Sequence, residues 1–240
     1  MVRRRKTMRF LGGFYAFPGG KVDSEDGAME VLGRCRGITA AEAERLVPSE
    51  EGLPSLAFWV AAARELLEET GVLPACDRTG RPIACVEPGA VARIEAFRGD
   101  HMAKRAPFAA LLEAEDWYLD LGPFRYLSHF ITPPSSPIRF SARFFLCPLP
   151  AGQAPRLILE EASEGRWVAP AEAHARFRAG EWPMAEPAEY GTQYLAQFPS
   201  YAALWSHHRD GQPKVAGIID RLDAARHYQF DWDTVVHPRA

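Results

Sequence analysis

The amino-acid sequence predicts an α+β fold, in which helices and strands occupy separate stretches of the chain. Apolar residues recur with a helical period over 56–70 and again over 87–117. Short segments typical of strands follow at 124–131 and 142–149. The 240 residues are enough to bury a substantial core, and they fit one domain with extensions or a domain and a half.

The first elements are expected around a glycine turn near the N-terminus. Residues 14–17 predict a strand that enters the turn Pro18-Gly19-Gly20. A short helix is then expected over 39–46, because Thr39 can serve as its N-cap and Glu42, three residues later, completes a capping box.

The next helix, over 56–70, is expected to have two chemically different faces. Ser55 is a suitable N-cap residue, and Gly71 is a suitable residue to end the helix. One face is an apolar stripe that consists of Leu56, Trp59, Val60, Ala63, Leu66, Leu67 and Thr70. The other carries three carboxylates at positions i, i+3 and i+4, namely Glu65, Glu68 and Glu69. Their mutual repulsion is a penalty that a bound divalent cation would reverse.

The same patterns predict the rest of the chain. Residues 87–117 should be helical in two pieces, interrupted near Gly99-Asp100 and at Pro107. Further elements are expected after the two strands named above: strands at 155–160 and 163–168, a helix at 170–179 that ends at Gly180, and a last helix over 215–227.

Nine residues, from Arg64 to Val72, match the second half of a Nudix box. The full pattern is G-x5-E-x7-R-E-U-x-E-E-x-G-U, where U is aliphatic. Its first half lies upstream, where Phe17-Pro18-Gly19-Gly20 supplies the glycine turn. Counting from that turn places Asp26 at the first acidic position and Arg34 at the arginine, but Cys35 follows where a glutamate is needed. Moving the second half to its own position restores every later match and leaves an insert of 30 residues.

On these residues the chain resembles the Nudix hydrolases. The resemblance is strongest to the subgroup that contains the peroxisomal coenzyme A diphosphatase, which carries a long insert inside the box. Three further stretches, at 9–23, 132–145 and 161–170, are similar to this subgroup. In the second stretch, Ser141-Ala142 stands where relatives carry Asp-Thr. The third is similar to the E-x-x-E-x-x-W strand common in Nudix folds.

The resemblance implies a Nudix-type α/β/α sandwich with a mixed β-sheet and helical insertions. The Nudix domain is expected over 1–200, and 201–240 would form a C-terminal helical extension. The insert within the box spans about 24–54, and a helical insertion spans about 87–118. The first insert either shapes a pantetheine or acyl pocket or is a solvent-exposed excursion. Of the aliphatic strand that precedes the arginines in relatives, only Met1-Val2 would remain.

The resemblance also implies the roles of the site residues. Mg²⁺ or Mn²⁺ would be held by Glu65, Glu68 and Glu69, because such ions bind through carboxylates, water and substrate phosphate oxygens. Arg64 would orient a carboxylate by a charge-assisted hydrogen bond, so that Glu65, Arg64 and Glu68 form the catalytic set. The general base is open between Glu65 and two downstream glutamates, Glu161 and Glu164, which can equally be exposed strand-edge residues.

A second pattern bears on the substrate. Relatives that cleave coenzyme A share L-L-T-x-R-[SA]-x3-R-x3-G-x3-F-P-G-G, which places Arg4, Arg9 and Gly13 at fixed positions and Arg5 at the Ser/Ala position. Guanidinium groups bind phosphate oxygens in bidentate fashion, which suits the diphosphate and 3′-phosphate of coenzyme A. The candidate substrate-binding residues are Arg4, Arg9, Gly19 and Gly20. The alternative is that residues 3–6 are a solvated terminus.

Three functions are compatible with these residues. The first is metal-dependent hydrolysis of coenzyme A or acyl-coenzyme A to (acyl-)4′-phosphopantetheine and 3′,5′-ADP. The second is the same chemistry on ADP-ribose, NADH or another nucleoside diphosphate derivative, because loops outside the box choose the substrate. The third is a Nudix-fold module that binds a ligand without turnover.

The composition limits the classes of molecule that this chain is expected to bind. The net charge of −3 gives no general attraction to nucleic acid or membranes, and no apolar run reaches the roughly 18 residues of a spanning helix. Cysteines without a C-x-x-C pair predict free thiols in a reducing cytoplasm: Cys35, Cys76, Cys85 and Cys147. The expected partner is a small-molecule nucleoside diphosphate substrate, and the expected assembly is a monomer or homodimer. The adjacent pair His207-His208 is expected at the surface.

Overall fold

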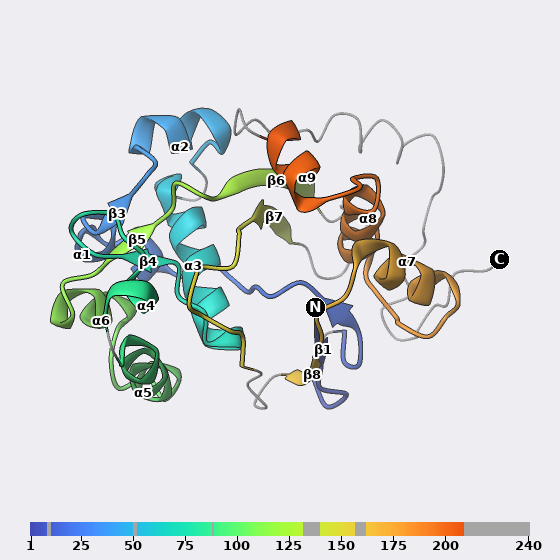
Figure 1. Cartoon of the computed structure of the whole chain (residues 1–240), viewed down its shortest axis with the longest axis horizontal. Coiled ribbons are helices and arrows are strands. Elements are labelled where there is room, and N and C mark those ends of the chain that lie inside the picture. Colours follow the sequence, from blue (N-terminus) through green and yellow to red (C-terminus); the bar gives the residue numbers. More distant parts are fainter. Residues whose placement is uncertain (9–10, 50–51, 88, 132–139, 157–161, 209–240) are drawn as a thin grey trace. The chain divides into compact units, whose positions relative to one another are not determined.

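The computed structural model shows helices together with mixed and antiparallel sheets, which confirms the α+β class (Figure 1). It describes residues 1–8, 11–49, 52–87, 89–131, 140–156 and 162–208. The chain divides into two compact units built from segments that are distant in sequence. The first unit comprises Met1–Phe17, Arg125–Phe145 and the chain from Leu159 onward, and the second comprises Pro18–Phe124 and Leu146–Ile158. Among the described helices, none combines the length and apolar character of a membrane span.

The first unit contains an antiparallel sheet of three short strands. In this sheet β1 (Val2–Arg4) lies between β2 (Tyr15–Ala16) and β8 (Ala162–Gly165). The strands expected at 14–17 and 163–168 are thus present in shorter form. A small core secures β2, because the ring of Tyr15 stacks on that of Trp182 with centroids 4.0 Å apart.

The remaining elements of this unit are a strand pair and helices. The strands expected at 124–131 and 142–149 are confirmed as β6 (Arg125–Ile131) and β7 (Ser141–Leu146), which pair with each other. The helix expected at 170–179 is confirmed as α7, and it packs on α8. The helical bounds in this unit are Pro170–Arg178 for α7, Glu186–Leu195 for α8 and Tyr201–His207 for α9. The sequence did not predict α8. α9 falls within the helical extension expected over 201–240, and the helix expected over 215–227 lies outside the described residues.

His208 corrects the expectation of a surface histidine pair. Its side chain is fully buried, and its Nε2 lies 2.8 Å from the hydroxyl oxygen of Tyr194. His207 is exposed, as expected. The prediction was wrong for His208 because its partner lies on the preceding helix, α8, which the sequence pattern did not reveal.

The second unit is built around α3 (Leu56–Thr70), which has the bounds predicted from its periodicity. Gly71 ends the helix with φ +70°, as expected for a left-handed C-terminal residue. The expected N-cap role of Ser55 is wrong. Ser55 has helical dihedrals, and its hydroxyl donates to a carboxylate oxygen of Glu44 instead of accepting from the first turn.

The insert expected at 24–54 folds into four short elements: η1 (Ser24–Gly27), α1 (Met29–Leu32), β3 (Cys35–Arg36) and α2 (Ala40–Leu46). The capping box predicted for α2 is confirmed. The N–H of Glu42 donates to Oγ1 of Thr39 at 3.2 Å, and the N–H of Thr39 donates to Oε2 of Glu42 at 2.8 Å. This local signal was sufficient because both partners lie within one turn.

The helical insertion forms α5 (Ala90–Met102) and α6 (Phe108–Ala114), and the short α4 (Ile83–Val86) precedes it; the three helices group together in Figure 1. The predicted interruption at Gly99-Asp100 is wrong, because α5 continues through both residues. The interruption at Pro107 is confirmed, since Pro107 is the N-cap residue of α6. A helix tolerates a glycine near its end at a modest energetic cost.

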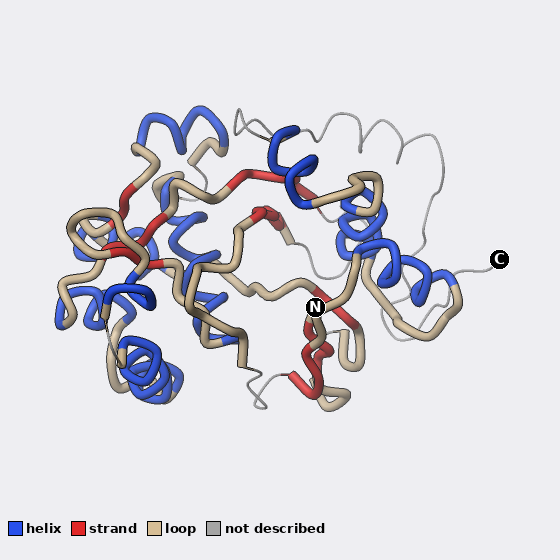
Figure 2. The backbone as a smooth tube through the Cα atoms, in the orientation of Figure 1, coloured by secondary structure: helices blue, strands red, loops and turns tan. Residues whose placement is uncertain are grey.

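The two insertions meet in one small mixed sheet. Its central strand is β5 (Tyr118–Asp120), which pairs in parallel with β3 and antiparallel with β4 (Ala75–Cys76). The guanidinium of Arg34 reinforces the junction by donating to the carbonyl of Trp117 at 3.2 Å. Figure 2 shows how short these strands are beside the helices around them. The strand expected at 155–160 is not found at 155–156, and its other residues lie outside the described ranges.

Candidate functional site

The acidic face of α3 lies against the glycine turn. The side chains of Glu65 and Glu68 are 13% and 15% exposed, so both carboxylates are largely withdrawn from solvent. A Cβ atom on Gly20 would lie 2.3 Å from Oε1 of Glu65, closer than any atom can approach without displacement. The N–H of Gly19 donates to Oε2 of Glu69 at 3.2 Å. The structure therefore brings both predicted turn glycines to the predicted carboxylates.

Arg64 is fixed because each of its N–H donors has an acceptor. Nε and Nη2 donate to the two carboxylate oxygens of Asp26 at 2.8 and 3.0 Å. Nη2 also donates to the carbonyl of Lys21 at 2.7 Å. Nη1 donates to Oε1 of Glu65 and to Oε1 of Glu68, both at 2.9 Å. A guanidinium group has five such donors, so the set is complete.

Asp26 and Arg64 join in space the two parts of the predicted Nudix box. Asp26 occupies the first acidic position counted from the glycine turn, and its side chain is 1% exposed. Its partner, Arg64, is 38 residues away in the chain and 5% exposed. The pair is bidentate and buried, which is the strong form of a carboxylate–guanidinium contact. Counting along the box identified Asp26, but no spacing rule could show that it reaches across the insert.

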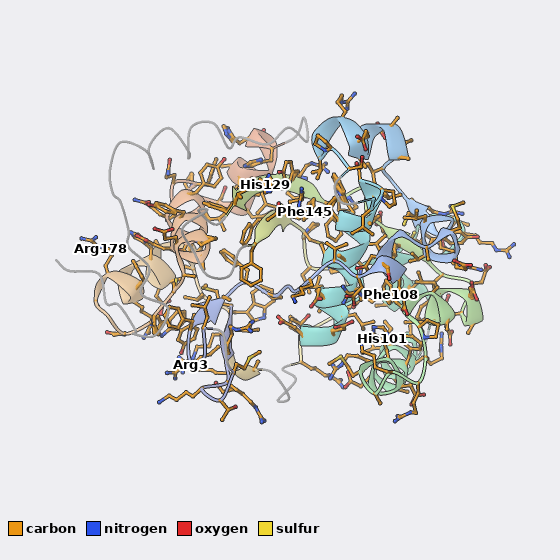
Figure 3. The ribbon with its side chains drawn as sticks, turned by 180° about the vertical axis from the view of Figure 1, so that it is seen from behind. Arg3, His101, Phe108, His129, Phe145 and Arg178 are labelled. Carbon is orange, nitrogen blue, oxygen red and sulfur yellow. The ribbon has the colours of Figure 1, made fainter. Side chains whose placement is uncertain are left out.

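A histidine that the sequence did not single out completes the environment of Glu68. Nε2 of His101, near the end of α5, lies 2.8 Å from Oε1 of Glu68, and its Nδ1 lies 2.9 Å from the carbonyl oxygen of Ala106. Both oxygens are hydrogen-bond acceptors, so these contacts favour the doubly protonated ring, in which both nitrogens donate. Figure 3 labels His101 beside Phe108, whose ring centroid is 6.0 Å from that of the imidazole. No motif relates Glu68 and His101, which explains why sequence analysis missed the histidine.

The two central carboxyl groups differ in acidity. Burial raises the pKa of Glu65 to about 7, against the opposing charge of Arg64. Burial also acts to raise the pKa of Glu68, but hydrogen bonds from His101 and Arg64 outweigh it and lower that pKa to about 2. The hydrogen bond to Glu68 in turn raises the pKa of His101. Near neutral pH, Glu68 is therefore ionised, while Glu65 is poised between its two forms.

The donor chemistry of this face fits a hard divalent cation. Glu65 and Glu68 each give Oε1 to Arg64, and within the described ranges no hydrogen bond reaches either Oε2. Among the described residues, no group of three or more Asp, Glu, His or Cys side chains is arranged to hold a metal ion by itself. Such a face suits Mg²⁺, which takes one or two carboxylates and completes its shell with water and phosphate oxygens.

The predicted substrate arginines belong to a different part of the chain. Arg4 lies in β1 of the first unit, where its N–H donates to the carbonyl of Phe14 and its carbonyl accepts from the N–H of Gly13. Arg9 lies outside the described residues. The substrate-binding roles of both arginines remain predictions.

Of the two downstream glutamates expected as candidates for the general base, Glu164 lies in the described part of the chain. Glu164, in β8, accepts a hydrogen bond from the hydroxyl of Tyr15 at 2.8 Å and forms ion pairs with Arg166 and Arg3. The Tyr15 hydrogen bond is the main cause of a lowered pKa at Glu164. These contacts give Glu164 a structural role in the sheet of the first unit, and its role as a base remains a prediction. Glu161 lies outside the described residues.

The crystal structure of a Nudix hydrolase from Alicyclobacillus acidocaldarius is similar to this chain with a TM-score of 0.64 and 33% sequence identity. The likeness covers 85% of this chain and 86% of that one. The chain belongs to the Nudix hydrolase family. No family model matches the chain. Membership in this family fits the prediction that the glycine turn and α3 are the two halves of a Nudix box separated by an insert, and that assignment stays a prediction.

Two curated relatives of this Nudix hydrolase are similar at lower identity. Nudix hydrolase 7 of Caenorhabditis elegans is 26% identical over 200 residues, which are 82% of this chain and 55% of that protein. The acyl-coenzyme A diphosphatase NUDT19 of Homo sapiens is 26% identical over 231 residues, which are 85% of this chain and 62% of that protein. The chain thus spans less than two thirds of either relative. The expected resemblance to the coenzyme A diphosphatase subgroup is confirmed.

Proposed function

We propose that this Nudix hydrolase is a diphosphatase that uses Mg²⁺ or Mn²⁺ to cleave coenzyme A or acyl-coenzyme A. The observation that carries the proposal is the pair Glu65 and Glu68, held by Arg64 through one oxygen each, with the second oxygen of each left for a cation. The substrate follows from the likeness to the acyl-coenzyme A diphosphatase NUDT19 and from the two arginines in the N-terminal pattern.

The chemistry requires charge neutralisation and a base. One or two of the predicted ligands Glu65, Glu68 and Glu69 would hold the cation, and water and phosphate oxygens would complete its shell. Once bound, the ion would neutralise the diphosphate and make water more acidic. Arg64 keeps Glu65 and Glu68 in place, and the glycine turn brings the backbone N–H of Gly19 to the same face. The base that takes the proton from attacking water is open between Glu65, whose Oε2 would then not be a cation ligand, and the downstream Glu161 and Glu164.

The proposed reaction adds water across the diphosphate of coenzyme A. The oxygen of water bonds to one phosphorus, the bridging P–O bond breaks, and the bridging oxygen leaves with the other phosphate. The products are 3′,5′-ADP and 4′-phosphopantetheine, or its acylated form. Arg4 and Arg9 would bind phosphate oxygens, to which a planar guanidinium can donate two parallel hydrogen bonds.

A mass-resolved hydrolysis panel tests the proposal. The chain is offered coenzyme A, a short and a long acyl-coenzyme A, ADP-ribose and NADH, with Mg²⁺ or with Mn²⁺. We expect 3′,5′-ADP from the coenzyme A species. Glu68→Gln should lower the rate more than about 100-fold, since even changes behind a metal ligand cost about 10–100-fold. Glu30→Gln, on an exposed position of α1, is the matched control and should keep the wild-type rate.

Each result separates the alternatives. AMP from ADP-ribose or NADH, without 3′,5′-ADP, would keep the hydrolysis and replace the substrate. Turnover that survives Glu68→Gln would remove the carboxylate face from the mechanism. Binding of a diphosphate without any turnover, unchanged by Glu68→Gln, would identify a ligand-binding module.

A further inference from the structure

The helical insertion contributes a buried side chain to the carboxylate face. His101 is 5% exposed, and both its ring nitrogens are engaged: Nε2 with Oε1 of Glu68 at 2.8 Å and Nδ1 with the carbonyl of Ala106 at 2.9 Å. The rings of Phe97 and Phe108 lie on it, with centroids 5.8 and 6.0 Å away. The imidazole therefore has little freedom to rotate or withdraw.

Two side chains bind the same oxygen of Glu68. Arg64 donates through Nη1 to Oε1 at 2.9 Å, and His101 reaches that same Oε1 at 2.8 Å. Among the described residues, none hydrogen-bonds to Oε2 of Glu68. When one oxygen of a carboxylate accepts hydrogen bonds from two fixed donors, the side chain is held in one rotamer. Its other oxygen then points in a fixed direction.

The clamp differs from the contact that holds Glu65. In the part of the chain that the structure describes, Oε1 of Glu65 accepts a hydrogen bond from Arg64 alone. Arg64 is on α3 itself, whereas His101 is on α5 and reaches Glu68 across 33 residues of sequence. α5 is tied to the same unit by buried Ile94, so the position of the imidazole is set by a helix rather than by a loop.

We propose that His101 is a positioning residue, which clamps Oε1 of Glu68 so that Oε2 is presented to the divalent cation. The proposal rests on the proposed function only in assuming that a cation binds at this face. Outer partners that orient a ligand typically change metal affinity about 10–100-fold when removed. The helical insertion is then a part of the site, because it carries His101 to α3.

Mn²⁺ binding measured by electron paramagnetic resonance, without substrate, tests the proposal. His101→Leu removes both hydrogen bonds and is expected to weaken Mn²⁺ binding about 10- to 100-fold. His101→Gln can still donate to Glu68 and should retain part of the affinity. Ile94→Val loosens the packing of α5 without touching the carboxylates, and it should bind Mn²⁺ as the wild type does. Circular dichroism confirms that each variant is folded.

A double-mutant cycle assigns the effect to Glu68. If His101 acts through that carboxylate, His101→Leu costs no further affinity once Glu68 is changed to Gln. Equal or tighter Mn²⁺ binding by His101→Leu overturns the proposal, since it would mean that the imidazolium only repels the cation. The same weakening in Ile94→Val also overturns it, because loose packing would then suffice.

The substrate panel keeps this proposal apart from the proposed function. Weakened Mn²⁺ binding in His101→Leu, together with no hydrolysis of any diphosphate by the wild type, supports the clamp and rejects the diphosphatase. If the wild type hydrolyses coenzyme A and His101→Leu binds Mn²⁺ as tightly as the wild type, the diphosphatase is supported and the clamp is rejected. A wild-type chain that binds no Mn²⁺ overturns both.

Discussion

Arg64 and Asp26 determine how an interrupted motif can still form one site. The pair is almost fully buried, and Asp26 also accepts from the N–H of Asp23 at 2.8 Å. Removing one partner of a buried ion pair leaves an uncompensated charge, and this is the main reason such changes destabilise a protein. The insert between them can therefore vary in length only as far as the two side chains still meet.

Replacing Asp26 with Asn should lower the free energy of unfolding by about 3 kcal/mol, because Arg64 would lose an anionic partner in a buried position. The expected cost is at the lower end of the usual range, since three other acceptors remain on the guanidinium. Urea denaturation followed by circular dichroism measures it.

Asp23→Asn is the matched control for that measurement. Asp23 also faces Arg64, but at 4.0 Å and with 58% of its side chain exposed, so its loss should cost less than about 1 kcal/mol. Equal costs for the two substitutions would contradict the assignment of Asp26 as the buried partner.

The site was predictable from sequence only where its residues obey a spacing rule. Glu65, Glu68 and Glu69 share a helical face, so their proximity followed from their numbers alone. His101 obeys no such rule, because its place beside Glu68 depends on how α5 packs. Asp26 lies between these cases: counting placed it in the motif, while its contact with Arg64 required the folded insert.

At the scale of elements, a pair of residues that bond within one turn was sufficient to predict a helix start. The type of a single residue was not. The capping box of α2 was predicted because Thr39 and Glu42 bond each other. Serine is a common N-cap residue, yet the hydroxyl of Ser55 donates a hydrogen bond to Glu44. Parallel pairing between β3 and β5 was beyond prediction, because strands that short carry too few residues to show a period.

Gly99 was wrongly taken as a break, and α5 should become more stable without it. Gly99 lies within α5, and a Cβ atom added to it would meet nothing within 4 Å. Gly99→Ala should therefore raise the free energy of unfolding by about 0.5–1 kcal/mol, through the entropy that glycine loses in a helix. The midpoint of urea denaturation measures the gain.

Gly89, at the start of the same helix, is the contrasting position. Its φ of +79° is one that side chains rarely adopt, so Gly89→Ala should lower the stability by about 1–2 kcal/mol. If both substitutions shifted stability in the same direction, backbone conformation would not be the factor that separates them.

At the scale of the whole molecule, the two insertions support the box together. The insert contributes β3 and the helical insertion leads into β5, and a Cβ on Gly37 would lie 2.3 Å from the backbone nitrogen of Gly122. Such close backbone approach joins segments that are remote in sequence. The second unit therefore contains the glycine turn, the carboxylates, the buried pair and His101.

Because the carboxylates belong to that cooperative unit, a cation bound to them should stabilise the fold. A ligand at 100 times its dissociation constant adds about 2.7 kcal/mol to the free energy of unfolding. For a chain of this size, that gain corresponds to a rise of about 5–10 °C in the midpoint of thermal unfolding. Differential scanning calorimetry with and without Mn²⁺ measures it, and EDTA should reverse the shift.

Glu68→Gln locates the origin of that stabilisation. The variant lacks the charge of the clamped carboxylate, so Mn²⁺ should leave its midpoint almost unchanged, while Glu30→Gln should respond as the wild type does. An equal shift in Glu68→Gln would place the cation elsewhere on the chain. A wild-type midpoint unaffected by Mn²⁺ would mean that repulsion among the three glutamates is relieved by Arg64 and His101 alone, with no part left for a metal.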